Sequence, residues 1–144
     1  MILKASLNDS RILAKMAIKI WENDSVEELE QEFDEFAVNS DMTSFIKYID
    51  KKPVGFATAS IRYDYVEGCE TSPVGYLEGI YVEDFYRNNN FARDLVEACE
   101  EWVKSKGIKE FASDCELTNL DSLAFHLAVG FSEANRIICF KKDI

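Results

Sequence analysis

Hydrophobic residues recur at helical spacing in the first quarter of the chain. Apolar side chains lie three or four positions apart over residues 12–20 and again over 26–37, which predicts two consecutive helices. Ser25, followed three residues later by Glu28, is a capping-box pattern that marks the start of the second helix. A short strand is expected before them, at residues 2–5.

The pattern then changes to strands. A tight polar turn at residues 50–53 separates two extended apolar runs, so these runs are expected to pair as an antiparallel hairpin. A loop at 66–74, marked by Gly68 and Pro73, follows the hairpin. The strands predicted in this region are 43–49, 54–65 and 75–82.

The last third returns to alternating elements. A helix starting at Phe91 is expected to end at Gly107, and a helix at 120–129 to end at Gly130, because glycine commonly follows the last helical turn. Strands are predicted at 109–113 and 137–140. The resulting order, β-α-α-β-β-β-α-β-α-β, predicts an α/β fold with a mixed, mostly antiparallel sheet flanked by helices. No linker divides residues 1–144, so one domain is expected.

Charge narrows the classes of partner. The 144 residues carry 27 acidic and 16 basic side chains, a net charge of −11. Phosphate backbones and anionic membranes repel such a chain, whereas a cationic substrate is attracted, although net charge also simply confers solubility. Nine carboxylates and no Lys or Arg lie between Glu22 and Asp41. A few of them are expected near a binding site and the rest on a solvated helix face.

The cysteine and histidine content and the hydropathy of the chain argue against a metalloprotein, a membrane protein and a secreted protein. The four cysteines are widely spaced and His126 is the sole histidine, so no metal site is expected. No apolar run approaches the roughly 18 residues of a membrane span. The first residues lack a basic region followed by an apolar run, so a cytoplasmic protein with reduced thiols is expected.

Residues 77–95 carry the most informative pattern, a strand that runs through a polar turn into a helix. A helix N-terminus offers unpaired N–H groups to an anion, and consecutive asparagines tolerate the left-handed backbone that a phosphate cradle often needs. Arg87 and Arg93 add positive charge. By composition alone, an ordinary strand–turn–helix connection explains the segment equally well.

Glu78 stands inside the apolar strand 75–82. Strand alternation would direct its neighbours, Leu77 and Gly79, to the opposite face. A carboxylate in an apolar strand is costly to bury unless it is paired or functional. Glu78 is therefore either a functional group or a surface residue at a sheet edge.

The strand–turn–helix resembles the acyl-CoA-binding motif of the GCN5-related N-acetyltransferase superfamily, R/Q-x-x-G-x-G/A at the start of a helix. This chain reads Arg87-Asn88-Asn89-Asn90-Phe91-Ala92, with Asn90 where the family usually has glycine. Residues 59–82, 111–114 and 126–131, together with Asn119, are similar to one branch of the bacterial aminoglycoside 6′-N-acetyltransferases.

This resemblance implies that acetyl-CoA donates its acetyl group directly to the 6′-amine of an aminoglycoside. Glu78 would bind the amine and assist its deprotonation, and His126 would protonate the departing thiolate, where relatives have Tyr. From the residues alone, Asp114 can also be a turn aspartate, Asn119 a helix N-cap and His126 a packed side chain. The remaining implied substrate contacts are Trp21, Tyr65, Asp114 and Asn135. At the position of Asn135, some relatives have an acidic residue instead of an amide. The implied CoA contacts are Ile80, Tyr81, Val82, Arg87, Asn88, Asn89, Asn90, Phe91, Ala92, Arg93 and Asn119.

The resemblance also implies a homodimer, for which the sequence itself has no assembly signal. Two other functions remain open. The chain could acetylate another polyamine or small amine, or it could bind acyl-CoA without catalysis, which the departure at Asn90 makes plausible.

Overall fold

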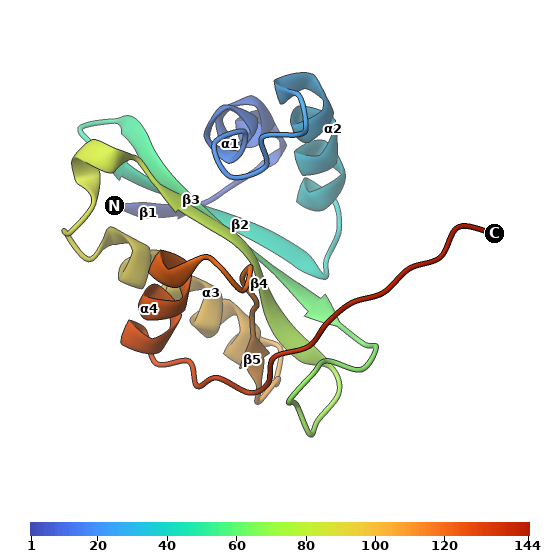
Figure 1. The fold of residues 1–144 in the computed structure, drawn as a ribbon. Coiled ribbons are helices and arrows are strands. Elements are labelled where there is room, and N and C mark those ends of the chain that lie inside the picture. Colours follow the sequence, from blue (N-terminus) through green and yellow to red (C-terminus); the bar gives the residue numbers. More distant parts are fainter.

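The computed structural model describes all residues, 1–144, and forms one mixed sheet with helices on both faces (Figure 1). The five strands lie in the order β1-β2-β3-β4-β5. Their bounds are β1 Ile2–Lys4, β2 Met42–Ile49, β3 Lys52–Arg62, β4 Val74–Val82 and β5 Phe111–Ala112. The helices are α1 Ser10–Ala17, α2 Val26–Ala37, α3 Phe91–Ser105 and α4 Leu120–Ala128, with short 3-10 turns η1 Leu7–Asp9 and η2 Asp84–Tyr86.

The sheet pairs as the order of elements predicts. Strands β1 to β4 are antiparallel neighbours, and β4 pairs with β5 in parallel because α3 intervenes between them. The hairpin turn between β2 and β3 places Asp50 and Lys51 at positive φ. Positive φ at both central residues is typical of the two-residue hairpin turn whose twist matches that of the paired strands.

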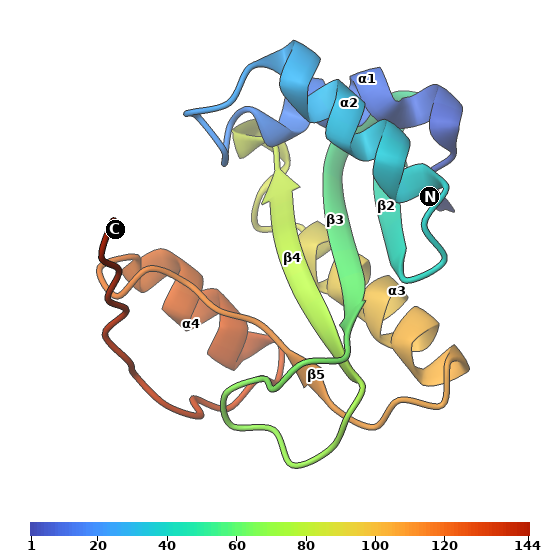
Figure 2. The ribbon, with the colours of Figure 1, turned by 90° about the vertical axis from the view of Figure 1, so that its right-hand side faces the viewer.

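Each face of the sheet has its own core. Helices α1 and α2 cover one face, where Leu29 and Phe33 of α2 pack on Ile46 and Phe56 of the sheet. Helix α3 buries Leu95 and other residues against the opposite face, and Phe125 of α4 packs against the same cluster. Figure 2 shows the two helices standing apart, one on each side of β4. Ser25 caps α2 and accepts from the Glu28 N–H at 3.1 Å, so the capping box is confirmed.

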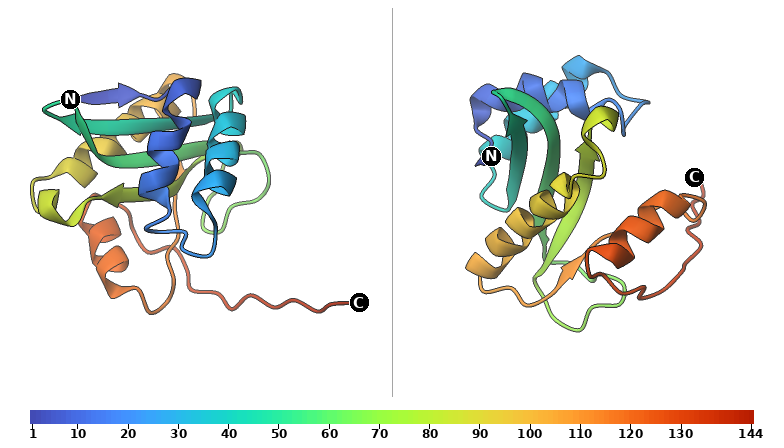
Figure 3. Two further views of the ribbon diagram at one scale, coloured as in Figure 1. Left: turned by 90° about the horizontal axis from the view of Figure 1, so that it is seen from above. Right: turned by 90° about the vertical axis from the view of Figure 1, so that its left-hand side faces the viewer.

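Several elements differ from the sequence prediction. Helix α1 ends at Ala17 rather than continuing to residue 20, and β3 begins at Lys52, inside the predicted turn, rather than at residue 54. Strand β3 ends at Arg62 rather than residue 65, and β5 covers only Phe111–Ala112. The strand expected at 137–140 is wrong. This segment is irregular and extends away from the body of the protein (Figure 3), leaving Ile138 and Phe140 81% and 90% exposed. A strand needs a neighbour to pair with, and this segment does not lie along β5, the strand at the nearest edge of the sheet.

None of the helices combines the length and the apolar character that crossing a membrane requires.

Candidate functional site

Glu78 lies at an irregularity in the pairing of β3 with β4. Ala59 pairs with Leu77 and Thr58 with Gly79, so Glu78 is an extra residue without a partner on β3. Such a bulge breaks strict alternation. The expectation that Gly79 points away from Glu78 is therefore wrong, because both residues face the α1–α2 side, where the Cβ position of Gly79 would lie 2.7 Å from the Trp21 ring.

The carboxylate of Glu78 is held by two residues of the adjacent strand. The Ser60 hydroxyl donates to Oε1 at 2.5 Å. The Arg62 guanidinium donates from Nε to Oε1 at 3.0 Å and from Nη2 to Oε2 at 2.8 Å. The Glu78 side chain is 27% exposed. A partly buried carboxylate with three donors is fixed in one orientation and remains reachable from solvent.

Asp114 joins the same cluster through a tyrosine. Its carboxylate accepts a hydrogen bond from the Tyr76 hydroxyl, and the Arg62 guanidinium lies 3.4 Å from the centre of the Tyr76 ring. Burial, and then the bond to Asp114, raise the pKa of Tyr76 well above its ordinary value. The phenol therefore stays protonated and keeps donating. Arg62 thus bridges the two carboxylates that the sequence analysis singled out separately.

A cavity of about 220 Å³ opens beside Glu78 between α2 and the sheet. Trp21 forms one wall, and Asp24 and Glu32 add two more carboxylates. Burial, and then repulsion from Asp24, Glu35 and Glu28, raise the pKa of Glu32. The residues lining this cavity include three carboxylates and no basic side chain, an environment that attracts a ligand with several positive charges.

Two expected substrate contacts lie elsewhere. Tyr65 is largely exposed on the loop after β3, where its hydroxyl donates to Glu67 at 3.3 Å. The Asn135 amide donates to the same carboxylate at 2.7 Å. The structure therefore brings Tyr65 and Asn135 together at Glu67, but neither lines the cavity beside Glu78.

The turn before α3 has the backbone that the asparagines predict. Asn88 and Asn90 adopt positive φ, 65° and 63°. Asn90 is the N-cap residue of α3, and no side chain caps the helix. The first N–H groups of Phe91, Ala92 and Arg93 therefore lack the intrahelical acceptors of later turns and remain available to an anion.

Side chains of this turn brace it from within. Arg87 donates to the Val82 carbonyl at 3.0 Å and pairs with Asp84 at 3.1 Å. Asn89 donates to the carbonyls of Tyr86 and Arg87. Arg93 donates to the Ala128 carbonyl at 2.7 Å and so joins the start of α3 to the end of α4. These contacts fix the shape of the turn and leave its backbone to bind a ligand.

Strand β4 loses its partner on one side before the turn. It pairs with β5 only through Gly75 and Tyr76, so Ile80, Tyr81 and Val82 have β3 on one side and no strand on the other. The separation of β4 from β5 and α4 is visible in Figure 2. Unpaired strand backbone is a ready partner for an extended ligand that carries amide groups.

His126 lies on α4 and contacts the end of β5. Its Nδ1 lies 2.7 Å from the Ser122 carbonyl and its Nε2 lies 2.8 Å from the Ser113 Oγ. Because a carbonyl can only accept, Nδ1 carries the proton in the neutral ring, and Ser113 donates to Nε2. Ser113 also lies 3.3 Å from the Leu77 carbonyl, next to Glu78 in the chain. Asn119 caps α4 by accepting from the Ser122 N–H at 3.1 Å.

Sequence reasoning missed four polar residues of this cluster. Ser60 and Arg62 lie two positions apart on one face of β3. Two polar side chains at alternate positions of a mostly apolar strand were the sequence feature that could have identified them as site residues. Tyr76 and Ser113 gave no local signal, because each acts through a residue at least 13 positions away.

Comparisons with known proteins show the family to which the chain belongs. Residues 11–131 match the family model described as acetyltransferase (GNAT) family. An aminoglycoside N(6′)-acetyltransferase type 1 of Serratia marcescens is 39% identical over 126 residues, 87% of this chain and 86% of that protein.

Solved structures give the same result for the fold. The 6′-N-acetyltransferase AAC(6′)-IG of Acinetobacter haemolyticus superposes with a TM-score of 0.95 at 36% identity, covering 100% of this chain and 99% of that one. AAC(6′)-Iy, in complex with the bisubstrate analogue CoA-S-monomethyl-acetylneamine, superposes with a TM-score of 0.95 at 33% identity, covering 100% and 98%. The chain belongs to the acetyltransferase (GNAT) family and, within it, to the aminoglycoside 6′-N-acetyltransferases.

Proposed function

We propose that this protein transfers the acetyl group of acetyl-CoA to the 6′-amine of aminoglycoside antibiotics and thereby confers resistance to them. The observation that carries the proposal is the acidic cavity at the Glu78 bulge, next to the unpaired end of β4. A drug with several ammonium groups matches the three carboxylates of that cavity. The relative bound to an analogue that joins CoA to neamine supports the same pairing of substrates.

Acetyl-CoA, the acetyl donor, would bind along the other side of β4. The backbone of Ile80, Tyr81 and Val82 would bind the extended pantetheine arm, and one of its N–H groups would polarise the thioester oxygen. The N–H groups of Asn88 to Arg93 would hold the pyrophosphate at the start of α3. The left-handed backbone at Asn88 and Asn90 supports this assignment, because it gives the turn the form that glycine gives it in relatives. Asn119, at the start of α4, would add a further contact.

The amine must lose a proton to react, since an ammonium has no lone pair. Glu78 would accept that proton, directly or through water, while Asp114 and Trp21 bind the rest of the drug. The amine nitrogen then forms a bond to the acetyl carbon as the carbon–sulfur bond breaks. Tyr65 and Asn135 would contact the drug only where it extends past the cavity toward Glu67.

The departing sulfur needs a proton, and the pair of His126 and Ser113 is suited to supply it. Ser113 lies closer to β4 than His126 does, since its Oγ is also 3.3 Å from the Leu77 carbonyl. We infer that Ser113 gives its hydroxyl proton to the sulfur and that His126, when both of its ring nitrogens carry a proton, replaces that proton from Nε2 and is left with the proton on Nδ1. This modifies the sequence expectation, in which His126 acts alone.

We also propose that the protein works as a homodimer. Ile137, Ile138 and Phe140 are 62%, 81% and 90% exposed in the single chain, on a segment that leaves the body (Figure 1). Exposed apolar side chains grouped in this way favour a surface covered by a partner. Sedimentation equilibrium should give twice the chain mass, and a monomer at micromolar concentration would contradict the dimer.

Two assays separate the proposed function from its alternatives. Release of thiol from acetyl-CoA is measured with tobramycin and with spermidine at matched concentrations, and tobramycin resistance is measured in a susceptible strain expressing the protein. Turnover of tobramycin, resistance, and the loss of both in Glu78→Gln are expected. A strong preference for spermidine would favour another amine acceptor. Binding of acetyl-CoA without turnover of any amine would favour a binding module.

A further inference from the structure

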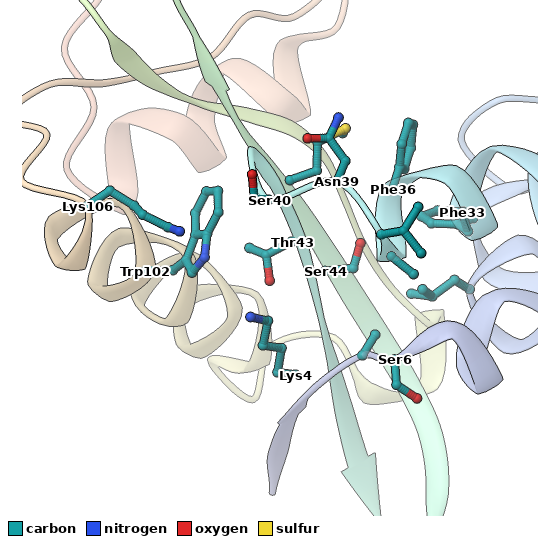
Figure 4. A pocket seen from close by; sticks show the side chains of 15 residues that line it. Lys4, Ser6, Phe33, Phe36, Asn39, Ser40, Thr43, Ser44, Trp102 and Lys106 are labelled. Atoms are coloured by element: carbon teal, nitrogen blue, oxygen red, sulfur yellow. The ribbon is translucent and has the colours of Figure 1, made fainter.

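A second cavity, of about 280 Å³, lies at the edge of the sheet where β1 ends (Figure 4) and shares Phe36 and Met42 with the cavity beside Glu78. It opens between the end of α2, strand β2 and the end of α3. Of the cluster around Glu78, neither Glu78 nor Arg62, Tyr76 or Asp114 lines it. Nothing in the proposed reaction uses this space.

The charge of this cavity is opposite to that of the chain. Although 27 of the 144 residues are acidic, none of the 15 residues that line it is Asp or Glu, and two are lysines. The ion pairs made by lysine involve Lys47, Lys52, Lys104 and Lys141, so Lys4 and Lys106 have no carboxylate partner. In an acidic protein, two unpaired cations at one cavity make a local site for an anion.

A buried hydroxyl group also favours an anion in this cavity. Thr43 is 4% exposed, and its Oγ1 has no hydrogen-bond partner in the structure. A buried polar group that lacks a partner costs free energy, which a bound acceptor would recover. Lys4 and Thr43 lie on the same face of the sheet. Lys4 pairs with Phe45, and Phe45 is two positions from Thr43 on β2, so the two side chains point to the same side.

The donors lie around the Trp102 ring. In Figure 4 the hydroxyl of Thr43 and the ammonium group of Lys4 lie on one side of that ring, and the ammonium group of Lys106 approaches it from the other side. Lys106 Nζ lies 5.5 Å from the centre of that ring. The position of Lys106 next to the C-terminus of α3 also favours a cation there, but that does not account for Lys4 or for the orphaned Thr43 hydroxyl.

We propose that this cavity binds a small organic anion, in which a carboxylate or phosphate group contacts Lys4 and Thr43 and an apolar body packs on Trp102, while Lys106 across the ring adds positive charge. Charged donors together with a neutral hydroxyl are the usual partners of such groups. An aromatic ring suits the uncharged part of the ligand.

The two tryptophans of the chain make the test specific, since Trp21 lies in the Glu78 cavity and Trp102 in this one. The indole N–H signals of ¹⁵N-labelled protein are followed during titration with phenylacetate, phenyl phosphate or uncharged phenylacetamide at constant ionic strength. Trp102→Phe assigns the two signals. A saturable shift of the Trp102 signal, with little change at Trp21, is expected with at least one anion, and the two anions show whether carboxylate or phosphate is preferred.

Lys4→Met should weaken binding of the anion by about tenfold, because it removes a charge-assisted contact, and Lys106→Met should weaken binding less, because Lys106 lies across the Trp102 ring. Thr43→Val should weaken it less. All three should leave acetyl transfer unchanged, which separates failure of this site from failure of the proposed function. Equal binding of phenylacetamide, equal affinity in a Lys4→Met/Lys106→Met double variant, or no saturable Trp102 shift would overturn the proposal.

Discussion

Arg62 binds both carboxylate oxygens of Glu78, at 3.0 and 2.8 Å. This contact joins residues 16 positions apart on neighbouring strands, at the point where the bulge turns Glu78 toward the cavity. The pair orients the carboxylate and balances its charge. A substrate amine that binds Glu78 would share this carboxylate with Arg62.

The first prediction concerns this orientation. Arg62→Lys keeps the positive charge but loses the planar two-point contact. A carboxylate displaced by about 1 Å can cost up to roughly 100-fold in rate, so we expect kcat for tobramycin to fall between about 10-fold and 100-fold. Arg136→Lys is the matched control, because Arg136 pairs with Glu133 on the C-terminal segment. Equal kcat in wild type and Arg62→Lys would show that Arg62 does not position Glu78.

The contact of Gly79 with Trp21 gives the second prediction. A Cβ at Gly79 would lie 2.7 and 2.8 Å from two atoms of the Trp21 ring, which is too close. We expect Gly79→Ala to lower Tm and to raise the KM for aminoglycoside by moving the ring. Trp21→Phe, in the same background, should recover part of the lost stability because the smaller ring relieves the contact. Simple addition of the two stability losses would argue against direct contact.

The third prediction uses the raised pKa of Glu32, caused first by burial and then by Asp24, Glu35 and Glu28. An acid whose pKa is higher in the folded than in the unfolded chain destabilises the fold once it ionises, and the cost is present above the folded pKa. Glu32→Gln should therefore stabilise the protein at pH 7, by about 0.5 kcal/mol or less because the side chain is exposed.

This gain should disappear below about pH 4, where Glu32 is neutral in both states. The same substitution should raise the KM for aminoglycoside, since the cavity loses a carboxylate. Glu30→Gln is the control on the same helix. Glu30 binds Arg11 at 2.8 Å and lies outside the cavity, so its loss should not stabilise the protein or change KM. Chemical denaturation at several pH values and steady-state kinetics measure both effects.

The fourth prediction tests the coupling of Ser113 with His126, whose Oγ and Nε2 lie 2.8 Å apart. If they pass one proton, Ser113→Ala, His126→Phe and the double variant should each lower the single-turnover rate by a similar factor, about tenfold. Ser105→Ala is the control, because Ser105 bonds only the Trp102 carbonyl at the end of α3. Losses that multiply in the double variant would indicate independent roles.

Local patterns predicted the local features well. The capping box at Ser25, the hairpin turn at Asp50–Lys51 and the left-handed asparagines before α3 depend on a few consecutive residues, and all are present in the structure. A carboxylate inside an apolar strand singled out Glu78, but only the family resemblance gave Glu78 and Asp114 their roles among the 27 acidic residues.

Long-range features could not be predicted from the same patterns. The bulge at Glu78 depends on how β3 and β4 align, and the Tyr76–Asp114 contact joins residues 38 positions apart. The strand expected at 137–140 was wrong for a related reason. An alternating apolar run indicates a strand only if another strand lies beside it, and a single sequence does not say whether that partner exists.

The central claim is most directly tested by thiol release from acetyl-CoA with three aminoglycosides at matched concentrations. Kanamycin A and tobramycin carry a 6′-amine, whereas paromomycin carries a 6′-hydroxyl. The account predicts rapid turnover of the first two and little of the third. Comparable turnover of all three, or none with any while acetyl-CoA binds, would contradict 6′-N-acetylation at Glu78.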